Sequence, residues 1–199
     1  MEREGNQIRL LPQPDDGEHR SDTTGLIFYP GGLVEPEAYI SMLAPIAAQG
    51  YPVVIISMPL DLAVFGANRA AAVLQGGAPQ SAERWVIGGH SLGGAMAARF
   101  AGRNGWEYTT LAGLVLLAAY PAESDDLSGL GLPVLSIWAS NDGLATPDER
   151  KQTARLLPEA TRYLVIEGGN HAGFGEYGPQ EDDGTRTICV HVRDFGSAR

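Results

Sequence analysis

The chain has 199 residues, a length that suits one domain with a single hydrophobic core. Its 24 acidic residues outnumber its 14 basic residues, for a formal net charge of -10, so its surface repels nucleic-acid phosphates and anionic lipid head groups. Its single cysteine, Cys189, cannot form an internal disulfide, and its four scattered histidines lack metal-ligand spacing, so we expect no metal and no disulfide scaffold.

Residues 1–24 form a polar leader that carries Pro12 and Pro14 and contains one short apolar run, at residues 8–11, which predicts a strand. We expect this leader to be only partly ordered, and residues 25–199 to form a single domain. The start of the chain lacks the apolar core of a signal peptide, and the longest apolar stretch is too short to cross a bilayer. These features predict a cytoplasmic protein with no membrane partner.

From residue 25 onward, apolar runs bounded by Gly and Pro alternate with segments of helical spacing. The runs are apolar on successive residues, as buried parallel strands are, and cover residues 26–30, 53–57, 85–89, 114–120, 134–140 and 163–168. Helices are expected at 37–49, 60–74, 92–103 and 147–157, the last with Thr146 as its N-cap. Residues 185–195 fit a helix or a strand. The alternation predicts an α/β fold, with a mostly parallel central sheet and helices on both faces.

The strand at 85–89 runs into Gly89-His90-Ser91-Leu92-Gly93, a G-x-S-x-G sequence followed by a helical segment. The motif alone is weak, but its position between a strand and a helix strengthens it. A serine on such a sharp turn needs strained backbone angles, and glycines two residues to either side remove side chains that would collide. We interpret Ser91 as a nucleophile and His90 as support for the turn; the alternative is an ordinary turn with a capping serine.

A serine nucleophile needs a base, usually an imidazole that a carboxylate orients. Asp142 follows the strand at 134–140, and His171 follows the strand at 163–168. Alone, each has a plain interpretation as a turn or loop residue. The order Ser91, Asp142, His171 at three strand ends favours a catalytic triad. Asp61 is the alternative acid, whereas His19 and His191 lie in less favourable segments.

Acyl transfer through a serine also needs two backbone N–H groups to bind the oxyanion. We expect one from Leu92, directly after the nucleophile, and one from the glycine-rich loop after the first strand, from Gly32 or else from Leu33. Glu35 and Tyr39 follow that loop and are candidates for the edge of a substrate pocket.

Two further patterns are not interpreted as sites. Residues 173–178 fit G-x-G-x-x-G, but only 21 residues follow, which leaves no room for a nucleotide-binding unit, so we expect a shaped loop beside His171. The acidic residues at 181–183, followed by Gly184, lack the ligand spacing of a calcium loop and are interpreted as a solvated surface turn.

From Leu26 onward the chain resembles the α/β-hydrolase superfamily. The segments YPGGLVEPEAY, SMPLDLAVFGANRA, GGHSLGGAMAA and GGNHAGFGEYG are similar to compact bacterial serine hydrolases related to dienelactone hydrolases. The resemblance implies ester hydrolysis through Ser91, Asp142 and His171 without a cofactor. Dienelactone hydrolases themselves use a cysteine nucleophile, whereas this chain has a serine, Ser91, at the corresponding turn. The short leader suggests that the first antiparallel strands of the sheet are reduced or absent.

The stretch between the strands at 114–120 and 134–140 is too short for a helical cap domain. An uncapped site is open and shallow, which favours small-molecule esters of small to medium acyl chain. An acyltransferase, a lactone hydrolase and a slow-turnover ligand-binding protein remain as alternatives on the same fold. The sequence does not indicate the oligomeric state.

Overall fold

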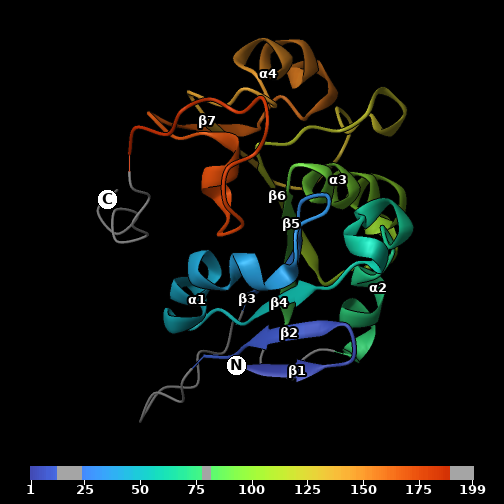
Figure 1. The fold of residues 1–199 in the computed structure, drawn as a ribbon. Helices are drawn as coiled ribbons and strands as arrows, with labels where there is room; N and C mark the ends of the chain where they lie inside the picture. Colours follow the sequence, from blue (N-terminus) through green and yellow to red (C-terminus); the bar gives the residue numbers. More distant parts are fainter. Residues whose placement is uncertain (13–23, 78–81, 189–199) are drawn as a thin grey trace.

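The computed structural model describes residues 1–12, 24–77 and 82–188, which build an eight-stranded sheet with helices on both faces (Figure 1). The strands are β1 (Glu2–Glu4), β2 (Gln7–Leu10), β3 (Thr24–Tyr29), β4 (Val53–Ile56), β5 (Arg84–His90), β6 (Leu111–Leu117), β7 (Val134–Ala139) and β8 (Arg162–Ile166). Their order across the sheet is β1-β2-β4-β3-β5-β6-β7-β8. β1 and β2 are antiparallel to their neighbours, and the other pairs are parallel. The predicted α/β fold is confirmed.

The helices divide the core between the two faces of the sheet. α1 (Ile40–Ala48), preceded by the short 3-10 helix η1 (Pro36–Tyr39), lies on one face, and α2 (Ala70–Ala72) and α3 (Leu92–Asn104) lie on the other (Figure 1). Leu43 of α1 and Phe100 of α3 accordingly belong to separate buried clusters. Because each face of a central parallel strand is covered, its residues are apolar in succession rather than in alternation.

α4 (Pro147–Thr153) begins where the sequence predicts. The Thr146 side chain accepts a hydrogen bond from the Glu149 N–H, and the Glu149 carboxylate accepts one from the Thr146 N–H at 2.7 Å. This capping box satisfies N–H groups that have no partner inside the helix. The predicted N-cap is confirmed, although the last predicted turn is a separate 3-10 segment, η7 (Ala154–Leu156).

The register of the parallel strands brings their carboxyl ends to one edge. Tyr29 of β3 is opposite Gly89 of β5, and His90 is opposite Leu117 of β6. The loops that follow β3, β5, β7 and β8 therefore leave the sheet at the same side, where ligands of open α/β sheets bind.

The leader contributes more structure than the sequence suggests. β1 and β2 form an antiparallel hairpin, and β2 pairs with β4 from Gln7 opposite Ile56 to Leu10 opposite Val53. Ile8 and Leu10 are buried against the α1 face. Both antiparallel strands are therefore present, but they are reduced to three and four residues, and β2 corresponds to the strand expected at residues 8–11. β1, the strand at the edge of the sheet, has three residues that are all exposed, which leaves no apolar pattern to detect.

The helix expected at residues 60–74 is wrong. The segment is divided into η2 (Pro59–Asp61), η3 (Ala63–Phe65), α2 and the π-type turn η4 (Val73–Gly77). Leu60 and Asp61 have φ values of 54°, in the left-handed region, which ends helical geometry there. The Asp61 carbonyl points instead to the loop after β3, where it accepts the Leu33 N–H at 2.8 Å.

The connection from β6 to β7 holds one short 3-10 helix, η6 (Glu123–Asp125), in agreement with an uncapped fold. Of the segment expected at 185–195, residues 185–188 have no helix or strand, and the rest lies outside the described residues. Within the described ranges, every helix is too short or too polar to pass through a bilayer.

Candidate active site

Ser91 occupies a sharp turn between β5 and α3. Its φ of 52° and ψ of -124° fall outside the regions that non-glycine residues prefer, and it is the residue directly before the first turn of α3. Two backbone bonds hold this conformation: the Ser91 N–H donates to the Leu117 carbonyl at 3.0 Å, and the Ser91 carbonyl accepts the Ala95 N–H at 3.0 Å. Residues held in such strained conformations cluster at functional sites.

The flanking glycines are required by close packing of the backbone. A Cβ on Gly89 would lie 2.6 Å from the Gly93 carbonyl carbon and 2.7 Å from the Tyr29 carbonyl oxygen. A Cβ on Gly93 would overlap the carbonyl oxygens of Tyr29 and Pro30. The G-x-S-x-G sequence therefore lets α3 begin directly against β3, which positions the α3 N-terminus beside Ser91.

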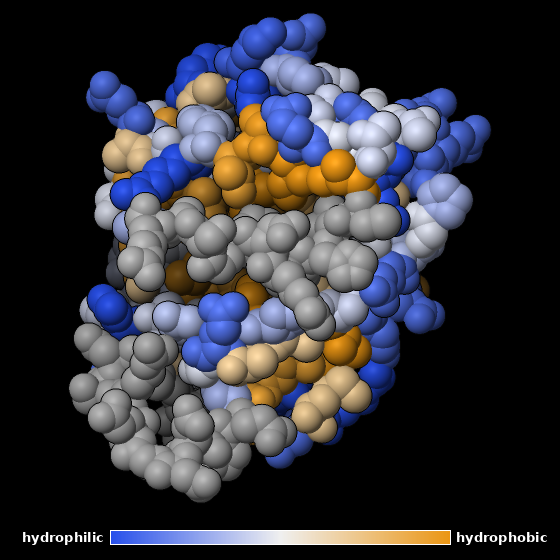
Figure 2. Space-filling model, turned by 90° about the vertical axis from the view of Figure 1, so that its left-hand side faces the viewer, coloured by the Kyte–Doolittle hydropathy of each residue, from blue (hydrophilic) through white to orange (hydrophobic). Residues whose placement is uncertain are grey.

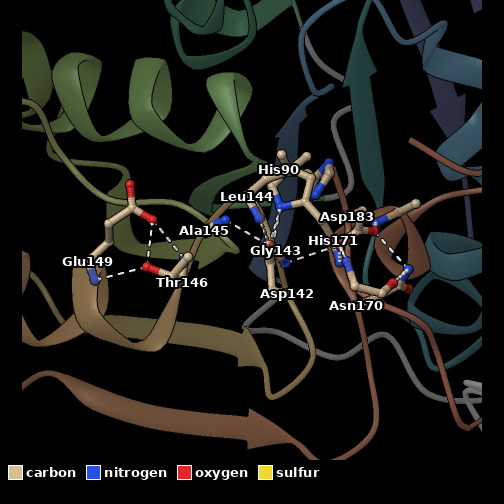
Figure 3. A network of polar contacts seen from close by, with 12 residues as sticks. His90, Asp142, Gly143, Leu144, Ala145, Thr146, Glu149, Asn170, His171 and Asp183 are labelled. Carbon is tan, nitrogen blue, oxygen red and sulfur yellow. Dashed lines mark hydrogen bonds and ion pairs between the residues drawn. The ribbon is translucent and has the colours of Figure 1, made fainter. Parts of the chain in front are cut away.

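Asp142 and His171 form a buried hydrogen-bonded pair (Figure 3). His171 Nδ1 lies 2.9 Å from Asp142 Oδ2 and 3.1 Å from Oδ1, and both side chains are buried. The Leu144 and Ala145 N–H groups donate to Asp142 Oδ1 at 2.9 and 2.7 Å and fix the carboxylate. Because Nδ1 faces a carboxylate, it carries the ring proton, which leaves Nε2 free to accept one.

The structure places Ser91 and His171 at the same edge without a direct bond between them. The ring of His90, the residue before Ser91, lies 4.5 Å from the His171 ring, centroid to centroid. The hydrogen bonds of the described residues include none from Ser91 Oγ to His171. Catalytic bonds of this kind are often long without substrate and shorten in the complex.

Asp183 also holds the His171 segment, a role that the sequence reasoning missed (Figure 3). Its carboxylate accepts the N–H groups of His171 at 3.1 Å and Ala172 at 2.8 Å, and the Asn170 side-chain amide at 2.7 Å. It also accepts the Gly143 N–H at 3.3 Å, on the turn that carries the acid. Asp183 therefore joins the acid turn to the histidine segment and is more than part of a solvated turn.

The loop after β3 distinguishes between the two expected oxyanion donors. The Leu33 N–H is already bonded to the Asp61 carbonyl at 2.8 Å, so it is not free to bind a substrate. The Gly32 N–H has no such partner among the described residues. A Cβ on Gly32 would lie 3.1 Å from the Leu92 side chain, so Gly32 and Leu92 are neighbours. This geometry favours Gly32 over Leu33, whose φ is 59°.

Tyr39 does not edge a pocket, contrary to expectation. Its side chain is 0% exposed, and its hydroxyl accepts the Gly31 N–H at 2.9 Å and lies 2.9 Å from His90 Nδ1. Glu35 is exposed beside the same loop, and its place as a pocket residue stays a prediction. His90, which we expect to support the turn, is buried directly before Ser91, a position that agrees with this expectation. Asp61 contributes a backbone carbonyl to the loop, not a carboxylate to His171.

Apolar side chains surround the loop after β3. Leu33 is 78% exposed, Leu60 is 77% exposed and Phe65 is 62% exposed, and a Cβ on Gly32 would lie 3.7 Å from the Leu62 side chain. These exposed side chains belong to the loop after β3 and to the segment at 60–65, which is bonded to that loop through the Asp61 carbonyl.

A second apolar feature is a cavity of about 340 Å³ between α1 and the sheet. Its described lining includes Phe28, Met42, Ile137 and Phe174 but does not include Ser91. Asn170 and Gly173 line it together with Phe174, so the cavity lies against the segment that carries His171. The view from the α1 side shows apolar surface in both the upper and the lower half of this face (Figure 2).

Within the described residues, no three His, Cys, Asp or Glu side chains are grouped to hold a metal ion. Cys189, His19 and His191 lie outside the described residues.

Comparison with known proteins gives one family and several structural neighbours. The sequence model of the α/β hydrolase family matches residues 25–193. The chain is similar to the solved structure of MGS-MChE2, an α/β hydrolase from the metagenome of Mar Chica lagoon sediments in Morocco, with a TM-score of 0.66, 17% identity, and coverage of 88% of this chain and 91% of that one. Esterase Est2 of Thermogutta terrifontis gives a TM-score of 0.63 and 15% identity, over 88% of this chain and 81% of that one.

A CIB-like hydrolase from Thermoplasma acidophilum gives a TM-score of 0.62 and 18% identity, over 79% of this chain and 82% of that one. No curated protein matches the sequence. At these identities the solved structures establish the fold.

Proposed function

The chain belongs to the α/β hydrolase family, and from this premise we propose that it is a serine hydrolase that cleaves carboxylic esters through an acyl-enzyme intermediate. The observation that carries the proposal is a combination of two features at the carboxyl ends of the strands. These are the strained turn at Ser91 and the buried Asp142–His171 pair, which is hydrogen-bonded at 2.9 Å. The Est2 structures with bound butyrate and with tabun-derived phosphoramylation support ester chemistry on this fold.

In the proposed first step, His171 Nε2 takes the proton of Ser91 Oγ while Oγ attacks the ester carbonyl carbon. The imidazolium that forms is stabilised by Asp142, whose carboxylate is already held by two N–H groups. His171 then gives the proton to the leaving alcohol, which departs and leaves an acyl group on Ser91. In the second step a water molecule attacks the acyl carbonyl carbon while His171 takes one of its protons. His171 then returns this proton to Ser91 Oγ as the acid leaves, which restores the free serine.

The oxyanion of each tetrahedral intermediate is bound by the N–H groups of Leu92 and Gly32. Leu92 is the first residue of α3, a helix of 13 residues, so the partial positive charge of the helix N-terminus adds to its N–H. A Cβ on Gly32 would lie 3.1 Å from the Leu92 side chain, a proximity that supports the choice of these two residues as donors.

The proposed substrate is a small-molecule ester with an acyl chain of small to medium length. The apolar side chains of Leu33, Leu60 and Phe65 offer contact for an acyl or alcohol group, and the short β6–β7 connection adds no cap over them. Each buried methylene contributes about 0.8 kcal/mol, so chain length should affect reactivity strongly until the apolar rim is filled.

The first test is intact-mass spectrometry after brief treatment with a fluorophosphonate, on wild type, Ser91→Ala and His171→Ala. One adduct on wild type, none on Ser91→Ala and slow labelling of His171→Ala would support the proposal. Folded wild-type protein that is not labelled would contradict it. In turnover assays Ser91→Ala and His171→Ala should each remove nearly all activity, and the double variant should lose little more, because the two groups act as a unit.

The second test is a series of p-nitrophenyl esters from acetate to octanoate, run with and without a competing alcohol. Hydrolysis predicts free acid as the main product at every alcohol concentration. Transfer of most acyl groups to the alcohol would favour an acyltransferase. Stoichiometric labelling without turnover on any ester would favour a ligand-binding protein.

A further inference from the structure

His90 is a buried titratable side chain beside the nucleophile that the proposed reaction does not use. It is 1% exposed, its Nε2 atom makes no hydrogen bond of normal geometry with the described residues, and the His171 backbone is a polar group that faces its ring. The unused histidine precedes Ser91 directly, in the strand that leads to the turn.

A chain of two hydrogen bonds joins His90 to the oxyanion loop. The Gly31 N–H donates to the Tyr39 hydroxyl at 2.9 Å, so the single hydroxyl proton is directed at His90 Nδ1, also at 2.9 Å. Burial raises the pKa of Tyr39 far above its usual range, which keeps that proton in place. The hydrogen-bond pattern thus assigns the His90 ring proton to Nε2, with Nδ1 as acceptor.

The other side of His90 contacts the proposed base. Its ring centroid is 4.5 Å from that of His171 and 5.5 Å from that of Phe174. The titratable groups that face it are Tyr39, His171 and Tyr177, whose ring lies 6.2 Å away. Burial and the neighbouring His171 lower the pKa of His90 well below its usual value. A neutral ring therefore packs against His171 and adds no second positive charge when His171 is protonated.

We propose that His90 is a positioning residue that couples the two halves of the site, holding the Gly31–Gly32 loop through the Tyr39 hydroxyl and holding the His171 ring by direct packing. The inference rests on the proposed function, because the loop matters only if Gly32 binds an oxyanion. The same residue then determines the position of an oxyanion donor and of the base.

The first test removes one hydroxyl. Tyr39→Phe keeps the aromatic ring but leaves the Gly31 N–H and His90 Nδ1 without their partner. A small displacement of the oxyanion loop should lower kcat about tenfold to a hundredfold, because misplaced donors lose most of their effect in the transition state. KM should change little, since the substrate-binding rim is untouched.

A matched control separates this role from stability. Tyr29 is also fully buried, and its hydroxyl accepts the Ala70 N–H at 2.8 Å and donates to the Ala67 carbonyl at 2.7 Å, next to α2. Tyr29→Phe deletes the same kind of bond on the other face of the sheet. It should lower the free energy of unfolding while kcat per folded molecule stays within about twofold of wild type. Equal kcat for Tyr39→Phe and Tyr29→Phe would overturn the proposal.

The second test addresses His171 through the pH profile. His90→Asn offers an oxygen near the position of Nδ1 and so retains an acceptor for Tyr39, but it removes the ring that packs on His171. Room for water beside His171 better solvates the imidazolium, so the acid limb of the kcat/KM profile should move to higher pH. Tyr39→Phe should leave that limb in place. An unmoved acid limb in His90→Asn would refute the packing half of the proposal.

A double variant tests the chain of hydrogen bonds from His90 through Tyr39 to Gly31. If Tyr39 positions the loop only while His90 holds its hydroxyl, Tyr39→Phe combined with His90→Ala should cost less in kcat than the product of the two single effects. Multiplicative losses would show independent roles and contradict the coupling. Fluorophosphonate labelling of wild type is the reference throughout: absence of labelling there would refute the proposed function, whereas equal kinetics in labelled variants would refute only the role of His90.

Discussion

Replacement of Asp183 by Asn should impair both stability and turnover, although Asp183 lies outside the proposed triad. Its Oδ1 atom accepts the N–H groups of His171, Gly143 and Gly184, at 3.1, 3.3 and 2.8 Å. Its Oδ2 atom accepts the Ala172 N–H at 2.8 Å and the Asn170 side-chain amide at 2.7 Å. Every neighbour on both oxygens is a donor, so an Asn NH₂ group faces donors in either orientation.

The magnitude follows from counting the bonds that are lost. If the NH₂ group replaces Oδ2, two donors lose their acceptor; if it replaces Oδ1, three do. Hydrogen bonds to a charged group contribute about 1.5–3 kcal/mol each, and partial exposure of Asp183 lets water replace some of them. We expect a loss of about 2–4 kcal/mol in the free energy of unfolding. Displacement of the His171 backbone should lower kcat by about tenfold or more.

The assay compares urea unfolding and ester turnover for Asp183→Asn and Asp182→Asn. Asp182 is its exposed neighbour, has a φ of 63° that Asn tolerates well, and loses the same charge on substitution. The control should stay within about 0.5 kcal/mol of wild type and keep its kcat. Indistinguishable stability and kcat for the two variants would show that Asp183 does not hold the histidine segment.

Three further predictions concern packing, a buried ion pair and pH. Gly93→Ala should lower the free energy of unfolding by roughly 4 kcal/mol or more, because the new Cβ overlaps two backbone carbonyl oxygens. Circular dichroism should then show loss of folded protein, and a wild-type melting curve would contradict this packing. Asp125→Asn should lower stability by about 2 kcal/mol with unchanged kcat, since its buried carboxylate pairs with Arg99 at 2.8 Å and Arg103 at 2.7 Å. Both arginines lie in the C-terminal half of α3, whereas Ser91 precedes its first turn, so a change in kcat without loss of stability would refute a purely structural role. Burial lowers the pKa of native His90 well below the value of 6.5 at which its unfolded form takes up a proton, so on its account stability should fall as the pH is lowered through 6.5. That slope should be smaller in His90→Asn, and equal slopes in urea titrations would refute it.

The sequence predicts the parallel part of the fold because its signals are local. Six apolar runs correspond to β3 to β8, each within a few residues, and the G-x-S-x-G turn has the strained geometry that its glycines imply. Asp142 and His171 meet because both follow strands of one parallel sheet. Such features depend on strand order and on the residues within one turn, both of which are readable along the chain.

The helix expected at residues 60–74 is wrong because its structure depends on a contact with a distant part of the chain. The segment after β4 has helical spacing, but the bond from the Leu33 N–H to the Asp61 carbonyl and the left-handed angles of Leu60 and Asp61 divide it into short turns. This bond joins residues 28 positions apart, so a periodic pattern in the sequence cannot predict it. Tertiary contacts override a weak local preference in this segment.

The roles of Asp183 and Tyr39 also depend on contacts between distant parts of the chain, so the sequence does not reveal them. An acid in a polar cluster and a tyrosine after a glycine pair resemble surface residues, because residue type does not reveal which backbone N–H groups they will meet. Both bond to the segments that carry the proposed chemistry: Asp183 to the His171 backbone, and Tyr39 to Gly31 beside the oxyanion donor. Sequence motifs can therefore identify the reacting groups of such a site. The groups that position them can be identified only in the folded chain, because their role depends on which backbone N–H groups need an acceptor there.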